Sequence, residues 1–177
     1  MTDLVTIADS IRYGRYKAYK GNADRIAELI TKALPHARKL LDLPEHLVYH
    51  IRPLGGKYNG VYMNFFSKIE LEVRRTNLGN VLETIMHELV HAEQFHQGRL
   101  KLKSGMYHWH DEPHKVGNDT YAKYRARPWE AEAFERQSVL ALKVSLMIAE
   151  ESKADISDLR IKYADEIEKV EESVICL

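Results

Sequence analysis

The stretch from Leu78 to His96 reads LGNVLETIMHELVHAEQFH, and its apolar spacing predicts a helix. Thr76 or Asn77 precedes this stretch and can cap the helix, because both side chains accept hydrogen bonds from free backbone amides. The apolar residues cover more than one face of the predicted helix: Val81, Leu82, Ile85, Met86, Leu89, Val90 and Phe95. We therefore expect a largely buried helix, with other elements packed around it.

Residues 87–91 within this helix read HELVH. Positions four apart on an α-helix are about 6 Å apart along the axis and roughly 40° apart around it. His87 and His91 can therefore direct imidazole nitrogens at one ion, with Glu88 beside it. Zinc held in this way lowers the pKa of a bound water to about 7, and a neighbouring carboxylate can take its proton. Two histidines and a carboxylate in an apolar helix would be costly without partners, which favours a metal site.

A catalytic zinc usually has three protein ligands, so a third ligand must come from another part of the chain. The extended pattern HExxHxxGxxH would need glycine at 94 and histidine at 97, but both positions hold glutamine, and His96 lies at a different helical angle. A candidate lies in PWEAEAFE, residues 128–135, where Pro128 can begin a second helix. Glu130 would then lie in the first turn of a helix that can pack against the first one.

HELVHAEQ (87–94) and RPWEAEA (127–133) together resemble the HExxH zinc metallopeptidases, or zincins, of the group whose third ligand is glutamate. They also look like small metallopeptidase-like proteins that are common in bacteriophages and bacteria. The resemblance implies one Zn²⁺ ion held by His87, His91 and Glu130. It further implies that Glu88 is the general base for hydrolysis of a peptide or protein substrate.

The chain departs from this family at Phe134, where related integral-membrane peptidases have an aspartate. If that aspartate orients a ligand histidine, another residue must do so here, and the candidates are Glu132, Glu135 and Asp119. A hydrogen-bond donor near the metal would also stabilise the negative charge that develops during hydrolysis. The polar, aromatic connection after the HELVH helix offers five such donors, which the sequence does not distinguish: Tyr107, His108, Tyr121, Tyr124 and Arg127.

The identity of the third ligand separates this peptidase from two alternatives. SprT-like proteases, which cut proteins crosslinked to DNA, have a later histidine as third ligand, and His110 or His114 could fill that role here. In a non-catalytic metal-binding protein with a zincin fold, a protein group such as Asp119 or His114 would close the fourth position. The third-ligand candidates besides Glu130 are therefore Glu132, His110, His114 and Asp119.

The segments on both sides of the HELVH helix predict an α+β domain. The predicted elements are a helix over 22–43, strands over 47–54 and 60–66 joined by a turn at 55–56, a half-exposed strand over 69–73, a hairpin around Lys103–Gly105, a helix from Pro128 to about Glu151, and a charged helix over about 156–174 that covers the core or docks a partner. Pro35 should kink or interrupt the first helix. The resemblance implies a single zincin-like domain over residues 1–177, with a small, mainly antiparallel sheet. An edge strand of that sheet, 69–73 or 60–66, would bind extended peptide.

The composition fits a globular protein without a strong excess of either charge. The chain has 177 residues, with 26 basic and 26 acidic side chains and a formal net charge of zero. This balance argues against bulk nucleic-acid binding, which needs a clustered basic surface. No apolar run reaches membrane-spanning length, and the first residues do not resemble a secretory signal. The chain has one cysteine, Cys176, which excludes an internal disulfide. We expect a cytoplasmic protein, located in a host cytoplasm or a virion if a phage encodes it, whose oligomeric state the sequence leaves open.

Overall fold

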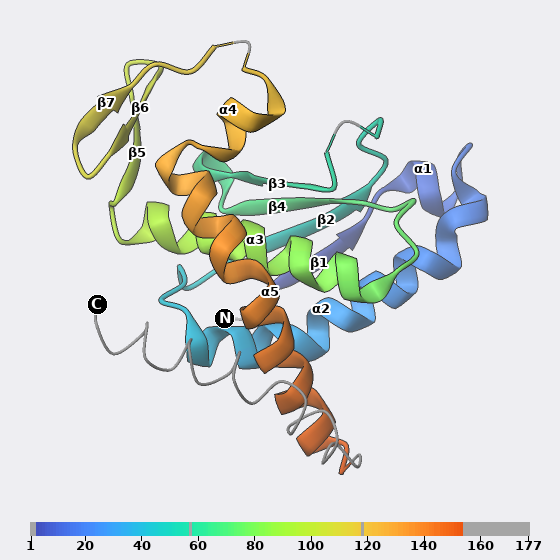
Figure 1. The fold of residues 1–177 in the computed structure, drawn as a ribbon. Coiled ribbons are helices and arrows are strands. Elements are labelled where there is room, and N and C mark those ends of the chain that lie inside the picture. The colour runs from blue at the N-terminus through green and yellow to red at the C-terminus, as the bar shows by residue number, and fades with distance from the viewer. Residues whose placement is uncertain (1–2, 57, 118, 154–177) are drawn as a thin grey trace.

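The computed structural model describes residues 3–56, 58–117 and 119–153 (Figure 1). The helices are α1 (Asp9–Arg12), α2 (Lys20–Leu40), α3 (Leu78–His96), α4 (Tyr121–Arg125) and α5 (Pro128–Glu151), with the short 3₁₀ turns η1 (Lys17–Tyr19) and η2 (Asn64–Phe66). The strands are β1 (Leu4–Ile7), β2 (Val48–Arg52), β3 (Gly60–Met63), β4 (Lys68–Glu72), β5 (Leu100–Lys103), β6 (Met106–Trp109) and β7 (Glu112–His114). The fold is α+β, as predicted.

The larger sheet has four strands in the order β1-β2-β4-β3. β2 pairs in parallel with both β1 and β4, and only β3 runs antiparallel, beside β4. The prediction of mainly antiparallel pairing is therefore wrong for this sheet. The strands predicted over 47–54 and 60–66 are not neighbours either, because β4 lies between them. The parallel pairing of β1 with β2 is possible because α2 connects the two strands across the sheet.

The smaller sheet consists of β5, β6 and β7, and both of its pairings are antiparallel. β5 and β6 form the hairpin predicted around Lys103–Gly105, in which Ser104 and Gly105 have φ angles of 51° and 77°. β7 adds a third strand that the sequence pattern did not indicate. This sheet follows the C-terminal end of α3 and lies to one side of the larger sheet (Figure 1).

The three long helices form two layers over the larger sheet, with α2 and α3 on the sheet and α5 outside them (Figure 1). α2 packs against β1 and β2, α3 packs against β3, and α5 lies across α3 and α2. Because α3 is enclosed between the sheet and α5, its apolar residues cover more than one face, and the predicted burial of this helix is confirmed. The largest fully buried side chains are Ile11, Ile26, Ile30, Leu47, Tyr49, Ile51, Ile69, Leu71, Ile85, Met86, Leu89 and Leu100.

The predicted bounds of α3 and α5 agree with the structure. Asn77 caps α3 by accepting a hydrogen bond of 3.2 Å from the backbone amide of Asn80. α2 begins and ends slightly earlier than predicted and continues through Pro35, so the predicted interruption is wrong. One face of α2 is buried on both sides of this proline, and its packing outweighs the single backbone hydrogen bond that proline removes.

β4 is buried along its length, whereas the alternation of its charged and apolar residues predicts a half-exposed strand. Glu70 and Glu72 are only 4% and 3% exposed. Glu70 forms ion pairs of 2.6 Å with Arg52 and 2.8 Å with Lys68. Burial alone would raise the pKa of Glu72, but hydrogen bonds from Arg74 and from backbone amides lower it to about 2. Ile69 and Leu71 face the core, and the glutamates lie on the opposite face of the sheet, where cationic neighbours cover them and compensate their charge.

The helix predicted over 156–174, with its covering or docking role, lies outside the described residues. Among the residues that the structure describes, none of the helices has the length and apolar character needed to span a membrane.

Candidate metal centre

Two helices supply the candidate metal ligands. His87 and His91 lie one turn apart on α3, and Glu130 lies in the first turn of α5, which packs against α3. Pro128 is the first residue of α5, as predicted, and its fixed φ angle suits the start of a helix. His87, His91 and Glu130 are buried, with exposed fractions of 7%, 8% and 6%.

The three side chains converge on one point. Nε2 of His87 lies 3.2 Å from Nε2 of His91. Oε2 of Glu130 lies 3.3 Å from Nε2 of His87 and 3.4 Å from Nε2 of His91. Among the described residues, the group of side chains able to hold a metal ion is this one: His87, His91 and Glu130.

These separations fit a zinc site. Zinc binds imidazole nitrogen and carboxylate oxygen at about 2.0–2.2 Å, so ligand atoms at the corners of such a tetrahedron are about 3.3–3.5 Å apart. The three observed separations, 3.2, 3.3 and 3.4 Å, are close to this range. Two imidazoles and one carboxylate are also a set that leaves one tetrahedral position for water in catalytic zinc sites.

Gln94 fixes the tautomer of His91. The amide nitrogen of Gln94 donates to the backbone oxygen of Trp129 at 3.0 Å and to the carboxylate of Glu132 at 3.1 Å. Its other terminal atom, which faces Nδ1 of His91 at 2.8 Å, must therefore be the carbonyl oxygen. Because a carbonyl only accepts hydrogen bonds, Nδ1 of His91 carries the proton. In the neutral ring, Nε2 then presents a lone pair to the convergence point.

The side chain of Gln137 makes the same kind of contact with His87. Its Oε1 atom lies 2.9 Å from Nδ1 of His87, which leaves Nε2 of His87 as the atom directed at His91 and Glu130. Two nitrogen lone pairs and a carboxylate oxygen within 3.4 Å of one another repel unless a cation, either a shared proton or a metal ion, lies between them. The two Nε2 atoms and the carboxylate oxygen are therefore placed to bind a cation.

The electrostatics of the three groups favour a cation at the same point. Burial would raise the pKa of Glu130, but contacts with His87, His91 and Tyr124 hold it well below its usual range. Burial would lower the pKa of His91, but Glu130 and Glu88 outweigh that effect and raise it. Oε2 of Glu130 is buried and makes no hydrogen bond to the described residues. A buried carboxylate oxygen without a donor is costly, and a metal ion would satisfy it.

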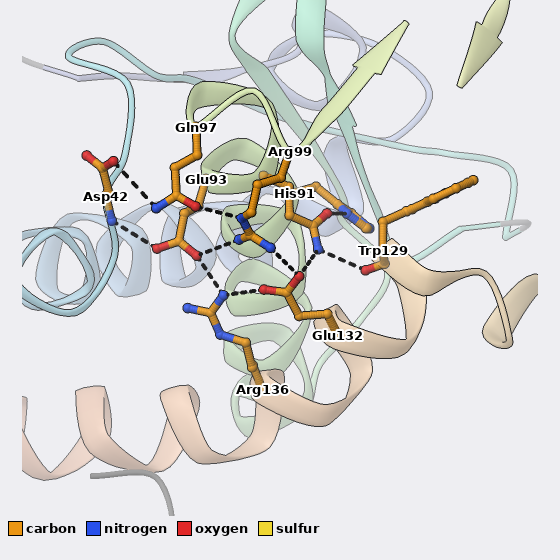
Figure 2. A network of polar contacts seen from close by, with 9 residues as sticks. Asp42, His91, Glu93, Gln97, Arg99, Trp129, Glu132 and Arg136 are labelled. Carbon is orange, nitrogen blue, oxygen red and sulfur yellow. Dashed lines mark hydrogen bonds and ion pairs between the residues drawn. The ribbon is translucent and has the colours of Figure 1, made fainter. Parts of the chain in front are cut away.

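Glu132, which accepts a hydrogen bond from the amide of Gln94, belongs to a network of charged side chains. Figure 2 shows this network around Glu93, Arg99 and Arg136. Glu132 accepts a hydrogen bond of 2.6 Å from Arg99, and Arg136 joins Glu132 to Glu93 through contacts of 2.7 and 2.6 Å. Glu93 also accepts a hydrogen bond from a backbone amide in the segment after α2. The network links α3, α5, the start of the smaller sheet and the end of α2, so it restricts the position of the His91 ring through Gln94.

Glu88 is the next residue after the first ligand and is 6% exposed. Burial raises its pKa, although the two histidines act in the opposite direction. β3 lies directly against it: a Cβ atom added at Gly60 would be 3.0 Å from Oε1 and Cγ of Glu88 and 2.8 Å from Cγ2 of Thr84. Because Gly60 has no side chain, there is room beside β3 for the carboxylate of Glu88.

A cavity of about 910 Å³ opens beside His87 and Glu88. Its lining residues come from α3, from the start of β3 and the residues before it, from α4 and the residues around it, and from α5. The described residues that line the cavity are Tyr58, Asn59, Gly60, Asn80, Glu83, Thr84, His87, Glu88, Val116, Gly117, Asp119, Tyr121, Tyr124, Arg127, Phe134 and Gln137. The candidate metal centre is therefore buried but borders a space large enough for a ligand.

Replacing Gly60 with alanine should lower the free energy of unfolding by about 1–3 kcal/mol, because the new methyl group would overlap Thr84 and Glu88. Gly21 provides the matched control: it lies in α2, and a Cβ atom there would have no neighbour within 4 Å. Gly21→Ala should raise the same free energy by about 0.5–1 kcal/mol. Urea unfolding followed by circular dichroism measures both effects. Equal changes in the two variants would contradict a close contact at Gly60.

The other predicted third ligands do not join the group. Glu132 instead reaches His91 through Gln94, so of the three residues considered for orienting a ligand histidine it is the one that acts, indirectly. Asp119 forms hydrogen bonds of 3.0 and 2.6 Å with Arg127. The ring of His110 lies against Trp109, the last residue of β6, and the ring of His114 lies against Trp129, in the first turn of α5. His96 lies near Asp42 at 3.7 Å, away from the centre.

Gln94 and Gln137 are the residues of the centre that the sequence analysis missed. Gln94 lies three residues after His91, within one helical turn, and Gln137 lies seven residues after Glu130, two turns along the same face. Both spacings were present in the sequence. Glutamine is common on helices, however, so the spacing alone did not mark either residue as an orienting group.

Comparisons of the chain with protein-family models, with curated proteins and with solved structures found no match. Function therefore rests on the residues and their geometry.

Proposed function

We propose that this protein is a zinc-dependent peptidase in which His87, His91 and Glu130 hold one ion and Glu88 is the general base. The observation that carries the proposal is the triangle of two Nε2 atoms and one carboxylate oxygen, 3.2–3.4 Å on each side, next to an open cavity. A zincin-like fold is part of the same proposal. It is supported by the HELVH helix packed between a sheet and the helix that carries Glu130.

A zinc ion at this point would polarise a bound water and make hydroxide available near neutral pH. Glu88 borders the cavity and follows the first ligand in the chain, so its carboxylate can accept a proton from that water and pass it to the leaving amine. Burial raises the pKa of Glu88, which makes its carboxylate a stronger base for the proton that it must accept.

Tyr124 is the best placed of the five donors considered for the developing negative charge. Tyr121, Tyr124 and Arg127 line the cavity, whereas Tyr107 stacks on Trp129 outside it. The guanidinium of Arg127 is already engaged by Asp119. Burial and Glu130, which accepts a hydrogen bond from the Tyr124 hydroxyl, raise the pKa of Tyr124, so the hydroxyl keeps its proton. It would donate to a substrate oxygen by turning from Glu130, whose carboxylate the ion would then hold.

β3 supports a peptide as the substrate. It is the edge strand of the larger sheet next to α3, so one side of its backbone has no partner strand among the described residues. Its first residue lines the cavity beside Glu88. An extended peptide can pair with such an edge through main-chain hydrogen bonds, which brings a peptide bond to the cavity without a demand for a particular sequence.

Two observations weigh against the alternatives. A closed, non-catalytic metal site would need a fourth protein ligand, but the group among the described residues has three members and borders a cavity. The SprT-like alternative needs His110 or His114 as a ligand, and among the described residues neither belongs to that group. A protease that acts on DNA-bound proteins would show DNA-stimulated cleavage, which we do not expect.

Protein purified without added metal should contain about one zinc ion per chain by mass spectrometry of the metals. Cleavage of a mixture of quenched fluorescent peptides should stop when 1,10-phenanthroline removes the ion and return when zinc is added back. A non-chelating isomer of phenanthroline is the control for non-specific inhibition. Chains that neither carry nor take up a transition metal would contradict the metal site, whereas zinc-loaded chains without cleavage would contradict the peptidase alone.

A further inference from the structure

The wall of the cavity formed by α3 carries a second carboxylate, that of Glu83. Glu83 precedes His87 by four residues, so the two side chains lie on the same side of the helix, about 6 Å apart along its axis. Successive residues of an extended peptide are about 3.3 Å apart. A substrate residue within about two positions of the cleaved bond would therefore lie next to Glu83.

Glu83 is the carboxylate of the cavity that remains available to a ligand. Among the described residues, no hydrogen bond or ion pair engages it, whereas Asp119 is paired with Arg127. The third carboxylate, Glu88, is assigned to proton transfer. A cationic group entering this part of the cavity would therefore find one unpaired negative charge, on Glu83.

A second, smaller cavity of about 350 Å³ adjoins the first and shares Asn80 and Glu83 with it. Its other walls come from α3 and α5 and are largely aliphatic, and among the described lining residues Glu83 is the only charged one. The aliphatic members are Leu82, Val139, Ala141 and Leu142. Such a pocket matches arginine or lysine, whose methylene stem packs on apolar walls while the charged end reaches a carboxylate.

We propose that Glu83 selects peptide substrates that carry arginine or lysine within two residues of the cleaved bond, with the side chain lodged between α3 and α5. This selectivity rests on the proposed peptidase function, but its physical basis is binding. It can therefore be measured without catalysis.

The test compares two fluorescein-labelled decapeptides that differ only at one central residue, which is arginine in one and its neutral isostere citrulline in the other. Binding is measured by fluorescence anisotropy on zinc-loaded Glu88→Gln protein, which should not cleave the peptides. The arginine peptide should bind about fivefold more tightly, the equivalent of about 1 kcal/mol for a partly exposed ion pair. The preference should shrink as salt is added, because the pair is partly screened.

Adding Glu83→Gln to this background should reduce the arginine preference to about onefold, and adding Glu83→Lys should reverse it in favour of a peptide with central glutamate. Glu135→Gln is the matched control, because Glu135 is an exposed acid on α5 that lines neither cavity. Absence of binding, a preference below about twofold, or one that survives Glu83→Gln would overturn the selectivity. If the preference holds while the wild-type protein cleaves neither peptide, only the peptidase function fails.

Discussion

Glu88→Gln should lower kcat/KM for peptide cleavage by about 10²–10⁴-fold and leave the zinc content unchanged, because general base catalysis contributes a factor of this size. Glutamine has nearly the shape of glutamate and can occupy the space beside Gly60, but its amide cannot accept a proton from water. The ligand atoms belong to other residues, so the ion should stay. Quenched fluorescent peptides give the rate, and mass spectrometry of the metals gives the zinc content.

Glu135→Gln serves as the comparison in this experiment, since it makes the same chemical change at an exposed position of α5 that lines neither cavity. It should retain cleavage of a peptide with a neutral residue at each position near the cleaved bond. A Glu88→Gln variant with zinc bound and a rate within threefold of the wild type would show that another group, or none, takes the proton.

Glu130→Gln should lower the affinity for zinc by more than about 100-fold, since even residues that only orient a metal ligand typically contribute 10–100-fold. The substitution replaces an anionic oxygen that faces two imidazole nitrogens at 3.3 and 3.4 Å with a neutral amide. Competition with a coloured chelator measures the affinity. Thermal unfolding gives a second readout, because zinc at 100 times its Kd should stabilise the wild-type fold by about 2.7 kcal/mol and the variant much less.

Glu135→Gln is again the control, because it makes the same chemical change on α5 at an exposed position. The metal-free variants should both fold, with helical circular dichroism like that of the wild type. Equal zinc affinity in Glu130→Gln and wild type would exclude Glu130 as a ligand. His110, His114 and Asp119 would then be the candidates for the third ligand.

The helices were predictable because their signals are local. The apolar spacing from Val81 to Phe95 and the capping side chain of Asn77 define α3 within its own residues, and Pro128 marks the start of α5. The pairing of the strands could not be predicted in this way, because paired strands lie far apart in the sequence. β1 has four residues and pairs in parallel with β2, more than 40 positions away, and nothing within LVTI indicates that partner. The parallel pairing of β1 with β2 depends on how α2 packs across the sheet, and that packing involves residues that are far apart in the chain.

The same distinction holds for the candidate metal centre. The HELVH spacing predicts that two imidazoles share one side of a helix, and the structure places Glu130 within 3.4 Å of both. The groups that orient the rings could not be predicted, because the roles of Gln94 and Gln137 depend on how α5 lies on α3. The burial of Glu70 in β4 was missed for a related reason, since the cations that cover its carboxylate come partly from a neighbouring strand.

The separation of the ligands along the chain has a consequence for biosynthesis. Glu130 follows His87 by 43 residues, so a ribosome working at about 5–20 residues per second adds it roughly 2–9 s later. During that interval both imidazoles of the nascent chain lack the carboxylate, and the side of α3 that α5 will cover is open. On the proposed ligand set, stable capture of the metal would therefore come late in the maturation of the polypeptide, after all the described strands have been translated.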